Sequence, residues 1–91
     1  MDTGEFGFLE ESRNGFLIRY FPIDIPEDFL YWHQDKKDRL VFVMHGEGWK
    51  IQFEDELPIY FSKGMVYPIP KDKFHRLIKG SSELIIKIKE F

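Results

Sequence analysis

The sequence predicts an all-β protein, a sandwich or barrel of eight to nine short strands. Runs of β-branched and aromatic residues recur along its 91 residues, and short turn signals separate them. No stretch keeps its apolar residues at helical spacing. The main competing interpretation is a helix over residues 31–45. The run Val41-Phe42-Val43 favours a strand there, because β-branched and aromatic side chains prefer strands.

A hairpin is expected near the N-terminus. The dipeptide Asn14-Gly15 supplies the positive φ angles that a tight hairpin turn needs. Pro22 and Pro26 then mark an extended connector, because neither residue can donate a hydrogen bond to a neighbouring strand. The strands expected in this part of the chain are Phe6–Glu10, Phe16–Phe21 and Phe29–His33.

The rest of the chain predicts further strands that are joined by short polar turns. They are Leu40–Met44, Trp49–Phe53, Leu57–Phe61, Met65–Ile69, Phe74–Lys79 and Leu84–Phe91. Apolar residues on these strands should supply much of the buried surface. The expected core residues are Leu40, Phe42, Met44, Ile51, Phe53, Ile59, Phe61, Val66, Leu77, Ile86 and Ile88.

The length and composition indicate one domain over residues 1–91, with residues 1–5 as a frayed, flexible tail. Hydrophobic residues make up 43% and charged residues 32%, which argues against disorder. There is no cysteine, so disulfides and thiolate metal sites are excluded. The net charge of −3 and the lack of a large basic cluster argue against nucleic-acid binding. Neither a membrane span nor a signal peptide is visible, and we expect a cytoplasmic protein.

Two segments, His33–Gly46 and Gly64–Lys79, resemble the two sequence motifs of the cupin superfamily, in which the first motif contributes His-x-His and Glu and the second a His. The resemblance covers the chain from about Tyr20 to its end. The matching residues are His33, Gly46, Gly64, Pro70 and His75, whereas Asp35 replaces a motif histidine and Arg39 replaces the glutamate. The resemblance implies a small antiparallel jelly-roll barrel that binds a small molecule.

The motif positions point to a metal site. Residues i and i+2 of a strand share a face about 6.5–7 Å apart, so His33 and Asp35 would both point into the barrel. His75 would be a third ligand, although it could equally be a structural histidine. Two histidines and one carboxylate leave open coordination positions, as in non-haem Fe(II) oxygenases. The implied cofactor is a divalent ion (Fe, Mn, Ni or Zn), and the implied enzyme is an oxygenase or an isomerase.

Arg39 argues against a metal, because the alignment places its cation in the same cavity. One alternative is an ion pair between Arg39 and Asp35, which would remove the carboxylate from metal binding. Another is that Arg39 holds the carboxylate or phosphate of a bound ligand. A metal-free binding or regulatory module with a degenerate site is therefore the second functional hypothesis. Because an inward arginine is unfavourable beside a divalent ion, the sequence favours the metal-free state.

Aromatic residues could line a ligand pocket beside these groups, and Tyr31 and Trp49 join Arg39 as candidate ligand-binding residues. Core or interface positions are the alternative for such aromatic side chains. Phenylalanines crowd the N-terminal third of the chain. We expect a homodimer that uses the N-terminal hairpin, because pairing protects an exposed edge strand.

Overall fold

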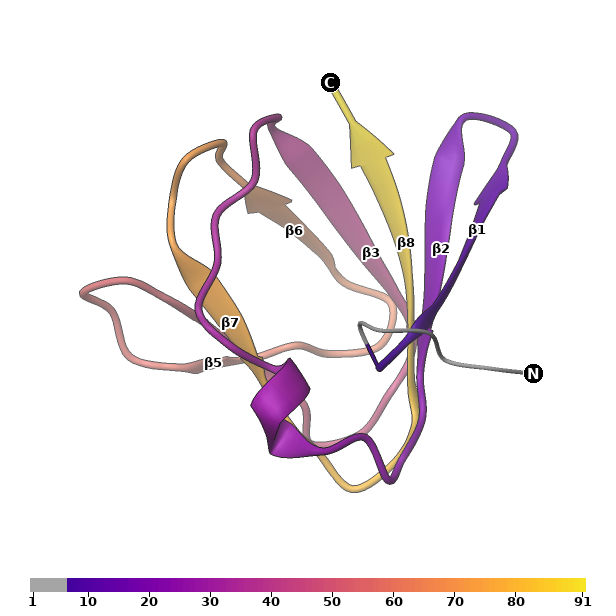
Figure 1. Ribbon diagram of the computed structural model, residues 1–91, viewed down its shortest axis with the longest axis vertical. Coiled ribbons are helices and arrows are strands. Elements are labelled where there is room, and N and C mark those ends of the chain that lie inside the picture. The colour runs from indigo at the N-terminus through magenta and orange to yellow at the C-terminus, as the bar shows by residue number, and fades with distance from the viewer. Residues whose placement is uncertain (1–6) are drawn as a thin grey trace.

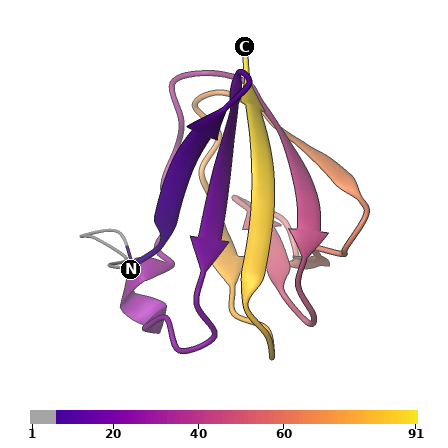
Figure 2. The same ribbon diagram turned by 90° about the vertical axis from the view of Figure 1, so that its right-hand side faces the viewer.

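The computed structural model describes residues 7–91 as two facing antiparallel sheets and one 3₁₀ turn (Figure 1). One sheet has five strands in the order β1-β2-β8-β3-β6, most of which lie side by side in Figure 2. The other has the order β5-β4-β7. The all-β prediction is confirmed. The strands are β1 (Leu9–Arg13), β2 (Phe16–Phe21), β3 (Arg39–His45), β4 (Lys50–Phe53), β5 (Ile59–Tyr60), β6 (Val66–Ile69), β7 (His75–Ile78) and β8 (Leu84–Glu90).

The first hairpin forms where the sequence predicts it, but its first strand lies further along the chain. Asn14 and Gly15 have φ angles of 52° and 83°, and they alone separate the paired residues Arg13 and Phe16. A two-residue turn pairs its flanking residues directly, so β1 has to continue to Arg13 instead of ending at residue 10. The predicted start at residue 6 and the tail at residues 1–5 lie outside the described residues.

The predicted strand Phe29–His33 is wrong. Residues Glu27–Phe29 form a 3₁₀ turn, η2, in which Phe29 N–H donates to the Pro26 carbonyl. Proline is well suited to precede such a turn, because its fixed φ already matches the entry. Beyond the turn the chain is irregular and makes one bridge to a described strand, between His33 and His75. The segment between β2 and β3 thus leaves the five-stranded sheet, contacts β7 of the other sheet, and returns to the five-stranded sheet at β3 (Figure 1).

The core lies between the two sheets, and β3 presents the opposite face to the one predicted. Val41 and Val43 are each 2% exposed, whereas Met44 is 52% exposed. Leu40 and Phe42 share the outer face with Met44, since alternate residues of a strand point to opposite sides. Ile59 and Val66 are also exposed. The confirmed core residues are Ile51, Phe61, Ile86 and Ile88, with Phe53 and Leu77 packed against them, and the core also contains Phe21, Ile25, Trp49, Ile69 and Leu84.

No helix within residues 7–91 is long and apolar enough to cross a membrane.

Candidate metal site and adjoining pocket

His33, Asp35 and His75 come together as the sequence predicts. His33 and Asp35 lie on the segment that precedes β3, and His75 is the first residue of β7. Reciprocal backbone hydrogen bonds of 3.0 and 2.9 Å join the two histidines, and Asp72 N–H donates to the Asp35 carbonyl at 2.7 Å. One ligand atom from each of the three side chains lies within 4.8 Å of the others. The backbone pairing therefore holds a cluster of two histidines and one carboxylate at the N-terminal end of β7.

Both imidazole rings are oriented by backbone carbonyls. Nδ1 of His33 lies 3.1 Å from the Tyr31 carbonyl, and Nδ1 of His75 lies 2.9 Å from the Lys73 carbonyl. A carbonyl can only accept, so each Nδ1 carries the proton and each neutral ring keeps the lone pair of its Nε2 free. Burial lowers the pKa of His75 from its usual value, although the Lys73 carbonyl opposes this effect. A neutral ring fixed in this way is the form that binds a metal ion.

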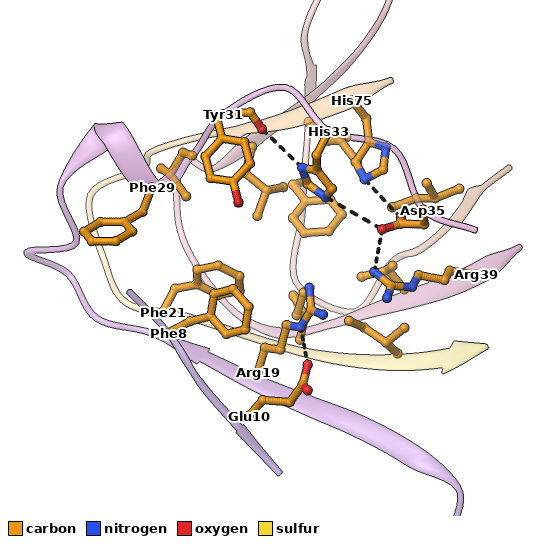
Figure 3. Close-up of a pocket in the computed structure, with 18 of the residues that line it drawn as sticks. Phe8, Glu10, Arg19, Phe21, Phe29, Tyr31, His33, Asp35, Arg39 and His75 are labelled. Carbon is orange, nitrogen blue, oxygen red and sulfur yellow. Dashed lines mark hydrogen bonds and ion pairs between the residues drawn. The ribbon is translucent and has the colours of Figure 1, made fainter. Parts of the chain in front are cut away.

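The two oxygens of Asp35 have different surroundings (Figure 3). Oδ1 lies 3.1 Å from Nη1 of Arg39. Oδ2 is buried without a hydrogen-bond partner among the described residues, and it lies 3.4 Å from Nε2 of His75. A buried carboxylate oxygen without a donor is unfavourable unless a cation or donor satisfies it. The predicted Arg39–Asp35 pair is thus present, and it occupies only one of the two carboxylate oxygens.

Glu90, which is not among the residues predicted from the sequence, completes the site. Its Oε2 accepts from Nε of Arg39 at 2.9 Å and lies 2.7 Å from Nη2. The guanidinium holds the pKa of the Glu90 carboxyl below its usual value. A signal was available in the alternation of β8, where Glu90 continues the inward series Leu84, Ile86 and Ile88.

An apolar pocket of about 570 Å³ adjoins the cluster between the two sheets (Figure 3). Its volume lies within the usual range for small-ligand sites. Arg39 and Tyr31 line it as predicted, and Tyr31 is 56% exposed at its edge. Trp49 lies elsewhere: its side chain is fully buried in the core and donates through Nε1 to the Ser82 carbonyl at 2.8 Å. Arg19 and Glu10, neither of which was predicted from the sequence, also line the pocket.

Comparison with known proteins identifies the fold. No family model and no curated protein matches the chain. Among solved structures, a cupin domain of Bordetella pertussis has a TM-score of 0.62 at 17% identity, covering 92% of this chain and 91% of that one. A cupin-2 domain-containing protein of Shewanella frigidimarina has a TM-score of 0.58 at 26% identity, covering 86% and 72%. The chain has a cupin fold.

A cupin-fold structure with a named metal also matches this chain. The Fe(II) form of HppE has a TM-score of 0.67 at 17% identity and covers 92% of this chain. This chain spans only 48% of HppE. At this identity the match shows the shared fold.

Proposed function

We propose that this cupin binds a divalent metal ion and acts on a small molecule in the adjoining pocket as a metal-dependent enzyme. Nε2 of His33, Nε2 of His75 and Oδ2 of Asp35 are the atoms that would hold the ion. The observation that carries the proposal is the unpartnered, buried Oδ2 of Asp35, which lies 3.4 Å from Nε2 of His75, while Nε2 of His33 lies 3.9 Å from Oδ1 of the same carboxylate. The Nδ1 atoms of both imidazoles face backbone carbonyls. Metal-binding histidines are typically oriented by such carbonyls.

Glu90 weakens the objection that Arg39 repels a metal. The Arg39 guanidinium contacts both Glu90 and Oδ1 of Asp35, so two carboxylates surround one cation. The three side chains together carry a net charge of −1, which favours a dication beside them. Arg39 therefore supports the proposal by fixing the Asp35 carboxylate with Oδ2 turned away from it.

The donor set favours an oxygenase or isomerase that uses Fe, Mn, Ni or Zn. Two histidines and one carboxylate form the ligand set of non-haem Fe(II) oxygenases, and the Fe(II)-containing HppE shares the fold. Such an ion supplies Lewis acidity and, for a redox metal, electron transfer at its open coordination positions. The apolar pocket walls would exclude water from a substrate that lies beside the ion.

Metal binding is the test. We expect protein purified without chelator to contain about one divalent ion per chain, and the stripped protein to bind Zn²⁺ or Mn²⁺ with one site in calorimetry. Asp35→Ala and His75→Ala should abolish this binding. His45→Ala is the matched control, because His45 is the third histidine of the chain and lies outside the cluster. Wild-type protein that binds no divalent metal would contradict the proposal.

A metal-free binding module is the second candidate, and the 3.1 Å contact between Arg39 and Asp35 favours it. In that case Asp35→Ala removes a partner of a largely buried guanidinium and lowers the free energy of unfolding, with no metal to lose. In the metal-binding case the same substitution abolishes metal binding. Measuring both quantities on one variant separates the two functions.

A further inference from the structure

Arg19 extends from β2 into the pocket that contains the candidate metal ligands (Figure 3). Its side chain is 18% exposed. Nε donates to Oε1 of Glu10 at 2.6 Å, and the guanidinium carbon lies 4.6 Å from the centroid of the Phe8 ring. No hydrogen bond within residues 7–91 engages the two terminal nitrogens of Arg19. A fixed guanidinium with unused donors in an apolar pocket is suited to bind a planar anion.

The walls around Arg19 are apolar. Phe8 and Phe21 lie beside each other, with ring centroids 4.9 Å apart, on the same side of the pocket as Arg19 in Figure 3. Aliphatic residues of both sheets line the rest of the pocket, among them Val41, Ile51 and Leu77. A ligand that reaches from Arg19 toward the candidate metal ligands therefore has to bury an apolar body.

The charges of the pocket select the charge of this ligand. Glu10, Asp35, Arg19 and Arg39 line the pocket, and Glu90 pairs with Arg39 from outside the lining. Together these three carboxylates and two guanidiniums carry a net charge of −1 with neutral histidines. A divalent ion would change this charge to +1. A monoanion then neutralises the pocket, whereas a dianion would again leave unbalanced charge in an apolar surrounding.

We propose that the ligand of this pocket is a small monocarboxylate with an apolar or aromatic body. Its carboxylate accepts hydrogen bonds from the terminal nitrogens of Arg19, and its body packs on Phe8, Phe21 and the aliphatic wall. The far end of the ligand faces His33, Asp35 and His75. This inference rests on the proposed function, because the divalent ion supplies the charge that the carboxylate balances.

Calorimetry with the Zn²⁺-loaded protein tests the proposal, with 3-phenylpropionate and its neutral amide as matched probes. We expect the wild-type protein to bind the acid about tenfold to a hundredfold more tightly than the amide. Arg19→Gln should remove this preference, and Arg19→Lys should keep part of it. Arg13→Gln is the control, because Arg13 also pairs with a glutamate, Glu11, but is well exposed on β1. Denaturant melts establish that each variant is folded.

The outcomes separate this inference from the metal site. Wild-type protein that binds Zn²⁺ but does not prefer the acid, or does not bind it up to its solubility limit, would overturn the inference alone. An acid preference that survives in Arg19→Gln would also overturn it, because the carboxylate would then bind elsewhere, such as at the ion. Tighter binding of phenyl phosphate, a dianion, would reject the monocarboxylate class. Failure to bind Zn²⁺ at all would instead reject the proposed function.

Discussion

At the scale of single residues, the two oxygens of one carboxylate allow both roles considered for Asp35. Oδ1 pairs with Arg39, and Oδ2 has no hydrogen-bond partner among the described residues and lies beside His75. The sequence could predict the residues of this cluster, because motif spacing places His33, Asp35 and His75. It could not show how the charge of Arg39 is balanced, because Glu90 lies 51 residues away along the chain and meets Arg39 only when β3 pairs with β8.

Glu90→Ala should weaken metal binding as well as stability. The substitution leaves the charge of Arg39 with Asp35 as its only described partner, so the guanidinium competes with the ion for this carboxylate. We expect metal affinity to fall about tenfold to a hundredfold, as for other residues that orient metal ligands. The free energy of unfolding should fall by about 1.5–3 kcal/mol, because a charge-assisted hydrogen bond is lost. Calorimetry and denaturant melts measure the two effects.

Glu83→Ala is the matched control, because Glu83 precedes the same strand but is exposed. Its metal affinity and stability should stay close to those of the wild-type protein. Unchanged metal affinity in Glu90→Ala would show that Glu90 does not support the metal site.

At the scale of elements, β3 shows why the position of a strand was easier to predict than which of its two faces is buried. The run of apolar residues located the strand, but its apolar character on both faces concealed which side is buried. An inward Arg39 already requires inward Val41 and Val43, because alternate residues share a face. The predicted inward Leu40, Phe42 and Met44 were incompatible with it. The polar residue at the end of the strand was therefore the better guide to facing than the apolar run.

Two substitutions on β8, one on each face, test which face of the five-stranded sheet is buried. Ile88 is 1% exposed and is paired with Val41 on the neighbouring strand β3, so both side chains point to the core. Ile85 points to the opposite, outer face of the sheet. We expect Ile88→Ala to lower the free energy of unfolding by about 2–5 kcal/mol and Ile85→Ala to lower it clearly less. Denaturant melts measure both. Equal losses, or a larger loss for Ile85→Ala, would contradict the assigned faces.

The outward position of Phe42 on β3 changes the loss of stability expected for Phe42→Ala. The sequence alone predicted a loss of about 3–5 kcal/mol, which applies to a fully buried phenylalanine. Phe42 lies on the outer face, where it meets the edge of the Phe16 ring at a centroid distance of 6.4 Å. We now expect a loss below about 3 kcal/mol in denaturant melts. A loss within the original range would restore the buried position.

At the scale of the whole molecule, the fold followed from turn signals and from two widely spaced motifs. Phe29–His33 was mistaken for a strand because its aromatic residues suit a strand, whereas the proline before it begins a 3₁₀ turn and tertiary contacts pair only His33. Local propensity could not reveal that this segment leaves the five-stranded sheet to contact β7 and then returns to it.

The ion pair that joins β3 to β8 makes stability depend on pH. Arg39 lowers the pKa of Glu90, so the folded state binds the proton less readily than the unfolded state. The stabilisation is complete above the usual value of 4.5 and is lost as the pH falls through the folded pKa. In chelator, the difference in unfolding free energy between the wild type and Glu90→Gln should therefore shrink between pH 6 and pH 3. A difference that stays constant would contradict this contribution.

The N-terminal hairpin places an edge strand where a second copy of the chain could pair. β1 is an edge strand of the five-stranded sheet, and no strand of residues 7–91 pairs with its outer edge. We expect a homodimer through the N-terminal hairpin, and light scattering at tens of micromolar protein should give twice the 11.0 kDa of one chain. Ser12→Pro, on β1 itself, removes a backbone N–H from the edge strand and should weaken the dimer, whereas Val66→Lys at the opposite edge should not. A monomer would contradict dimerisation, and dissociation by Val66→Lys alone would move the interface to β6.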